Sequence, residues 1–150
     1  LEYISYHQGK RKRKNQFQTG GMAMNNQIQQ RIDRLKSYGQ SLAGANVAYR
    51  EDWGTIYFGL IGKQFGMMSP EANDDAIITL KNKPEVNEEL REQYSEAIIP
   101  GYYANKTHWN SIRLAADEVT DEQIEQLILT SYELVYQKLT KKQKEELTTL

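Results

Sequence analysis

Polar side chains suited to contacting a nucleic acid gather in one short stretch of the 150-residue chain. The stretch holds Asn105, Lys106, His108, Trp109 and Asn110. An ammonium group binds phosphate, an amide hydrogen-bonds a base edge or a sugar, and an indole ring stacks on a base. Trp109 is also suited to core packing, and Asn105 to the backbone of an irregular loop. The stretch therefore indicates a binding surface, with structural roles left open for its members.

Further basic residues lie before and after this stretch. Lys63 falls in a predicted hairpin turn, and Arg113 lies on the strand that the stretch leads into. Lys81 and Lys83 add positive charge between them. The acidic loop 115–119 opposes these charges, since its carboxylates repel phosphate.

Catalytic groups are scarce in the sequence. Cysteine is absent, and His7 and His108 are the two histidines. No serine lies in a recognisable nucleophile motif, and no glycine-rich stretch joins a strand to a helix as a phosphate loop does. We therefore expect a protein that is not an enzyme and has no cofactor.

Two acidic groups are the alternative candidates for binding a hard cation. They are Glu85, Glu88, Glu89 and Glu92, and Asp117, Glu118, Asp121 and Glu122. Zinc is not expected, because it usually requires His and Cys ligands. Charges at this spacing are more typical of a solvated helix face, so we expect no metal site.

Charge is unevenly distributed along the chain, whose net charge is −1. Residues 1–21 hold the five basic residues of the run 10–14 and one acidic residue, a charge of +4, and the rest holds 14 basic and 19 acidic residues, a charge of −5. We expect 1–21 to be a flexible basic extension and 22–150 to be one domain. The basic run is either a solvated tail or a phosphate-binding arm. We expect a cytoplasmic protein, because cysteine is absent and no apolar run reaches the length of a membrane span.

Two kinds of periodicity predict the elements. Alternating and β-favouring residues predict strands at 47–49, 55–61, 64–68, 76–80 and 109–114, with a hairpin turn at Gly62-Lys63. Helical spacing predicts a first helix capped at Asn25 or Asn26 and a short one from 85 to 94, and capping boxes start two more at Thr120 and Thr140. The sequence predicts an α+β fold, in which an N-terminal helix and C-terminal helices pack on an antiparallel β-sheet meander.

The central stretch resembles the MmcQ/YjbR family, whose members carry the pattern PGY-x-x-N-K-x-H-W-N. The matching residues are Pro100, Gly101, Tyr102, Asn105, Lys106, His108, Trp109 and Asn110. The resemblance spans about residues 25 to 147 and implies a bacterial type of protein with a CyaY-like, frataxin-like sandwich. It also implies DNA binding through hairpin tips and the 105–110 loop.

Two functional hypotheses follow. The first is a nucleic-acid-binding protein that contacts mainly phosphate through Lys63, Asn105, Lys106, His108, Trp109, Asn110 and Arg113. The second is a protein-interaction or small-ligand module that uses the Tyr/Trp-rich face and has no nucleic-acid role. A continuous positive patch around Lys63, Lys106 and Arg113 would favour the first. A pocket lined by Tyr102, Tyr103 and Trp109, or an exposed apolar patch, would favour the second.

Overall fold

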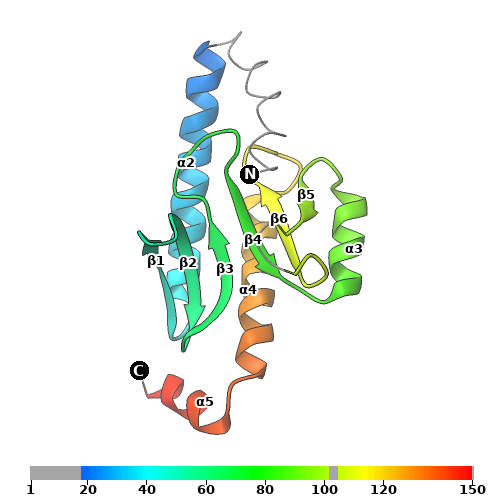
Figure 1. Ribbon diagram of the computed structural model, residues 1–150. Helices are drawn as coiled ribbons and strands as arrows, with labels where there is room; N and C mark the ends of the chain where they lie inside the picture. The colour runs from blue at the N-terminus through cyan, green and yellow to red at the C-terminus, as the bar shows by residue number, and fades with distance from the viewer. Residues whose placement is uncertain (1–17, 102–104, 150) are drawn as a thin grey trace.

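Six strands form one antiparallel sheet in the computed structural model (Figure 1), which describes residues 18–101 and 105–149, with side chains from residue 23 onward. The strands are β1 Ala45–Arg50, β2 Thr55–Leu60, β3 Lys63–Met68, β4 Ile77–Lys81, β5 Ile98–Pro100 and β6 Trp109–Arg113. Their order across the sheet is β1-β2-β3-β4-β6-β5. Short connections between neighbours produce the antiparallel meander from β1 to β4, as predicted.

Helices cover one side of this sheet. They are α2 Gln18–Ser41, α3 Pro84–Gln93, α4 Asp121–Gln137 and α5 Lys141–Thr148. Figure 1 shows α2 and α4 lying behind the strands, with α3 beside β5. Both predicted capping boxes are present, one from Thr120 to Gln123 and one from Thr140 to Gln143, so α4 and α5 begin where the sequence predicts.

The core lies between the helices and the sheet. From the sheet, Phe58 and Phe65 are fully buried, and their rings meet edge to face with centroids 5.8 Å apart. Phe65 also contacts Tyr132 of α4, at a centroid distance of 5.6 Å. A bulge shifts the register between β2 and β3: Phe58 pairs with Gly66 and Gly59 with Gln64, so Phe65 is the extra residue between them. The apolar stripes of α2 and α4 complete the core, which confirms the predicted α+β architecture.

The two faces of the sheet differ. Side chains alternate along each strand, so Ile56, Phe58 and Ile78 point to the helices. Tyr57 and Met67 pair in register on the opposite side. We call this side the open face, because none of the helices that the structure describes lies over it.

Three details differ from the sequence-based predictions. Residues 18–21, predicted to belong to the extension, lie in helix α2 together with Asn25, because no proline separates them from the rest of the helix. The hairpin turn falls on Ile61 and Gly62, which have φ of +47° and +74°, so that Lys63 starts β3. The short strand β5 was not predicted, because three residues ending in proline carry no clear alternation. Residues 1–17 of the predicted extension lie outside the described residues.

Candidate nucleic-acid interface

Several lysines from separate segments lie toward the same end of the sheet. Lys63 begins β3, Lys81 ends β4, and the loop that carries Lys106 leads into β6. Backbone pairing fixes the neighbourhood, because Lys81 is opposite Trp109 and the N–H of Asn82 donates to the His108 carbonyl at 2.9 Å. Gly66 of β3 pairs with Leu80 of β4, which places Lys63 near the same end. We call this region the lysine end; it comprises Lys63, Lys81, Lys83, Lys106 and Lys138.

The loop before β6 closes on Asn105. Its carbonyl accepts from the N–H groups of His108 at 3.2 Å and Trp109 at 3.0 Å. Its side-chain oxygen accepts from the N–H of Thr107 at 2.8 Å, so the amide shapes the loop, which is the structural role foreseen for it. Lys106 and His108 are exposed on this loop. Two of the candidate contact residues, Lys106 and His108, are therefore presented to solvent by a turn built on Asn105.

Helix α3 supports the loop from behind. Arg91 donates from Nε to the side-chain oxygen of Asn110 at 2.6 Å, and its Nη2 donates to the Lys106 carbonyl. Asn87 donates from Nδ2 to the Thr107 carbonyl at 3.1 Å, and Asn110 donates to the Asn87 carbonyl at 3.2 Å. These three side chains connect α3, the loop and β6 into one polar network. A polar Asn87 on a helix with an apolar inner stripe was the sequence signal for it, and the sequence analysis missed it.

Two predicted contact residues are buried. Asn110 and Arg113 are each 4% exposed. Asn110 belongs to the network under the loop, and Arg113 donates from Nη1 to the Glu96 carbonyl at 2.8 Å. Arg113 pairs with Ile77 at the far end of β4, away from Lys81. Neither side chain is exposed for contact in this structure, and alternation along β6 does not predict this burial.

Trp109 occupies an intermediate position. It is half-buried, and its carbonyl accepts from the N–H of Gly101 at 2.8 Å. A Cβ atom at Gly101 would lie 2.6 Å from the Cβ of Trp109, so only glycine permits this approach. Tyr102 and Tyr103, the other predicted walls of an aromatic pocket, lie outside the described residues.

Within the lysine end, Lys138 lies close enough to Lys81 to affect its charged state. Lys138 caps the C-terminus of α4. Partial burial, followed by the positive charge of Lys138, lowers the pKa of Lys81 from its usual 10.5. Two ammonium groups that disfavour each other are a site where a bound anion would be stabilised.

Neither a metal centre nor a membrane span emerges from the described part of the chain. No group of three or more His, Asp or Glu side chains in residues 18–101 and 105–149 is placed to hold a metal ion. None of the described helices is long and apolar enough to cross a membrane.

Comparison with known proteins assigns the family. The sequence pattern that defines YjbR matches residues 40–134, which is more than half of the chain. The chain belongs to the YjbR family. The YjbR match contains Lys63, Lys81, Lys83 and Lys106 and ends before Lys138.

Relatives and solved structures agree with the YjbR assignment. The chain is 31% identical over 102 residues to the uncharacterized protein YjbR of Escherichia coli K12, covering 68% of this chain and 84% of that protein. It is 34% identical over 82 residues to the uncharacterized protein YbdF of Escherichia coli O157:H7, covering 55% and 66%. The crystal structure of Deinococcus radiodurans protein DR2400 superposes with a TM-score of 0.68 at 32% identity, covering 78% of this chain and 87% of that one. A Pseudomonas syringae protein shares the fold, with a TM-score of 0.57 at 23% identity over 68% and 96%.

Proposed function

We propose that this YjbR-family protein binds nucleic acid through phosphate contacts at the lysine end, and that it does so without catalysis. The observation that carries the proposal is that lysines from β3, β4, the loop before β6 and the end of α4 lie toward one end of the sheet. These segments are far apart in sequence, so their approach is a product of the fold. A cluster of ammonium groups is the ordinary electrostatic footprint for a phosphate backbone.

The expected contacts read phosphate rather than base sequence. Asn110 and Arg113, two of the groups able to reach a base edge, are buried. The side-chain oxygen of Asn105 already accepts from Thr107. We therefore expect binding that tolerates different DNA sequences. Its affinity should fall with salt, and each neutralised phosphate should add about 0.9 to the steepness of log K plotted against log salt concentration.

Fluorescence anisotropy with a labelled mixed-sequence DNA duplex tests the proposal. The full chain and a chain that starts at Gln18, where α2 begins, are titrated at low and at near-physiological salt. Lys63→Gln and Lys106→Gln each remove one charge from the lysine end. Arg50→Gln is the matched control, because it removes one exposed charge beside the β1–β2 turn, at the opposite end of β2 from Lys63.

Binding by both chains, weakened by the two lysine variants and unchanged by Arg50→Gln, would support the proposal. Binding by the full chain alone would assign the affinity to residues 1–17. If neither the full chain nor the shorter chain binds the duplex at low salt, the proposal is overturned.

A further inference from the structure

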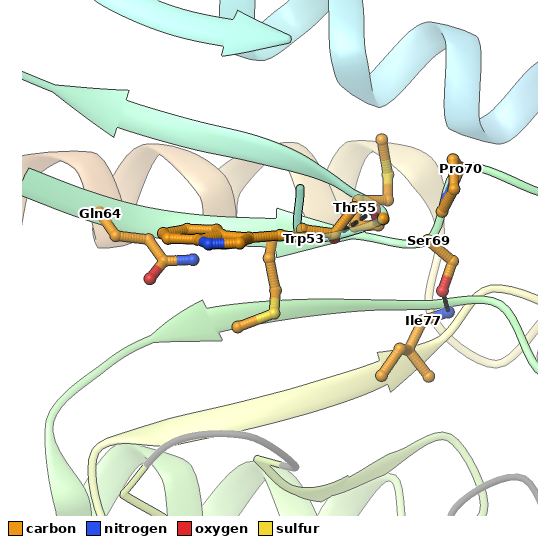
Figure 2. A pocket seen from close by; sticks show the side chains of 9 residues that line it. Trp53, Thr55, Gln64, Ser69, Pro70 and Ile77 are labelled. Atoms are coloured by element: carbon orange, nitrogen blue, oxygen red, sulfur yellow. Dashed lines mark hydrogen bonds between the residues drawn. The ribbon is translucent and has the colours of Figure 1, made fainter. Parts of the chain in front are cut away.

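A pocket of about 500 Å³ opens on the side of the sheet away from the helices. It lies along β2, β3 and the start of β4, and Figure 2 shows Trp53 extending across it from the β1–β2 turn toward Gln64. The lining residues are Trp53, Gly54, Thr55, Gln64, Met67, Met68, Ser69, Pro70 and Ile77. Its volume falls within the range of sites that hold small molecules.

Trp53 is exposed yet held in place. Its side chain is 53% exposed. The Arg50 guanidinium lies over the indole at 3.9 Å from the ring centroid, and Asp52 binds that guanidinium at 2.8 Å. Tyr57 meets the indole edge to face at a centroid distance of 5.6 Å. The turn thus presents an aromatic wall that is already oriented before any ligand arrives.

The rest of the pocket combines an apolar floor with a few polar groups. Met67 and Ile77 supply apolar surface. Ser69 Oγ accepts from the N–H of Ile77 at 3.0 Å, and Gln64 donates from Nε2 to the Gly66 carbonyl at 3.3 Å. Among contacts between described residues, these bonds leave the Ser69 hydroxyl hydrogen as a donor and the Gln64 carbonyl oxygen as an acceptor.

Charge and shape together define the ligand class. None of the nine described lining residues is acidic or basic, and the Arg50 guanidinium that lies over Trp53 is already bound by Asp52, so the pocket favours an uncharged ligand. An indole wall favours a flat ring that stacks on it. A glutamine amide pairs with the adjacent donor and acceptor of an adenine edge. We propose that the pocket binds an uncharged planar heteroaromatic ring of purine size, stacked on Trp53 and hydrogen-bonded to Gln64.

Free nucleosides and unpaired bases of a single strand share this chemistry. Adenosine carries no phosphate, so its binding does not depend on the lysine end. A failure of adenosine to bind would leave the proposed duplex binding untouched, and the reverse also holds.

Ligand-observed NMR with adenosine tests the pocket. Stacking on an indole shifts the adenine H2 and H8 signals upfield, and we expect a saturable shift that ribose does not show. Trp53→Leu should weaken binding by about tenfold or more and abolish the upfield shift. Gln64→Leu should weaken binding while retaining the upfield shift, because it removes the amide but not the indole.

Tyr49→Leu is the matched control, because Tyr49 is 51% exposed on β1 and does not line the pocket. It should leave adenosine affinity within about twofold, as expected of a surface substitution. A single-stranded deoxyadenosine oligonucleotide identifies the source: affinity that falls with Trp53→Leu indicates a base within a strand, whereas affinity that falls only with Lys106→Gln indicates free nucleosides. No saturable shift with adenosine, or an equal shift with Trp53→Leu, would overturn the proposal.

Discussion

The guanidinium group of Arg31 joins α2 to the segment that leads into α4. Its Nε binds the Asp121 carboxylate at 2.7 Å, and its Nη1 donates to the carbonyls of Leu114 at 2.9 Å and Ala116 at 2.7 Å. Its Nη2 donates to the carbonyl of Val119. The Arg31 side chain is 11% exposed, so little water reaches this region. Removing the guanidinium would therefore leave these oxygens without hydrogen-bond donors.

Replacing Arg31 therefore tests a stabilising role. Arg31→Lys should lower the free energy of unfolding by about 2–4 kcal/mol, because a single ammonium cannot satisfy the carboxylate and three carbonyls at once. Urea denaturation followed by circular dichroism measures the change. Arg34→Lys is the control: its side chain is 43% exposed and binds the carboxylates of Asp121, Glu122 and Glu125, a bond that an exposed lysine can partly replace, so the urea midpoint should hardly move. Equal losses from the two variants would contradict this account.

The effect of Lys138 on Lys81 leads to a prediction about the pKa of Lys81. The pKa of Lys81 is lowered from 10.5, mainly by burial and next by Lys138, so its protonated form is less favourable in the folded than in the unfolded protein. This destabilisation is present below the folded pKa and disappears as the pH rises toward 10.5. Lys138→Gln should raise the pKa of Lys81, and so should binding of a DNA duplex.

NMR titration of the Lys81 Cε signal measures both shifts. Lys36→Gln, on α2, is the control and should leave the titration unchanged. DNA binding should also weaken at alkaline pH, as Lys81 loses its proton. A Lys81 titration that neither Lys138→Gln nor DNA displaces would argue against coupling at the lysine end.

At the scale of elements, local signals were predictive where they acted within one segment. The hydroxyls of Thr120 and Thr140 and the glutamines three residues later fixed the starts of α4 and α5 from sequence. The burial of Arg113 was not predictable, because it depends on how β6 is covered in the tertiary structure. Trp53 was not among the predicted site residues, since nothing local shows that β3 and β4 complete a pocket beside it. The frataxin-like relationship implied by the resemblance stays a prediction.

Hydrogen bonds from helix α3 hold the loop before β6 in place. The effect of this support on DNA binding can be measured separately from the effect of a direct phosphate contact. Asn110→Ala should loosen the loop and weaken DNA binding while leaving the salt slope nearly unchanged, because it removes no phosphate contact. Lys106→Gln should instead reduce the slope by about 0.9. Anisotropy titrations at several salt concentrations distinguish the two. An Asn110→Ala variant with a reduced slope would show that the loop had lost Lys106 as a contact.

The joint between α2 and β1 depends on Gly44 and on α5. Gly44 has φ of +72°, and a Cβ there would lie 2.0 Å from Cδ2 of the buried Leu147. Gly54 has φ of +64° with nothing within 4 Å of a Cβ. Gly54→Ala should lower the free energy of unfolding by about 1–2 kcal/mol for the backbone conformation alone. Gly44→Ala should lower it by more, because the buried Leu147 side chain must also move.

A double-mutant cycle read by urea denaturation isolates that second contribution. In a Leu147→Ala background the overlapping methyl is absent, so the loss caused by Gly44→Ala should approach that of Gly54→Ala. An unchanged difference between the two glycine variants would show that α5 does not restrict this joint.

At the scale of the whole molecule, the lysine end is a local positive patch on an acidic body. Residues 22–150 have a net charge of −5, so distant carboxylates oppose the approach of DNA while the five lysines attract it. At 0.1 M salt, charges more than about 10 Å apart are largely screened from each other. Direct contacts between a lysine and a phosphate are shorter than this distance and are screened less. In the proposed binding, the sheet and helices determine where DNA would be contacted, and the surrounding negative charge limits the affinity.

Comparing the full chain with the chain that starts at Gln18 tests this balance. The first 17 residues carry five basic residues and one acidic residue, so their removal takes away a charge of +4. If the basic run adds phosphate contacts, the full chain should show a steeper salt slope, by up to about 4.5 for five neutralised phosphates. The shorter chain should keep a slope of about 2–3, set by two or three contacts at the lysine end, and Lys106→Gln should reduce the slope equally in both chains. If the shorter chain binds DNA without any response to salt, its binding does not involve phosphate contacts, because such contacts release counterions. That result would exclude the lysine end as the source of binding and leave residues 1–17 as the source of any salt dependence of the full chain.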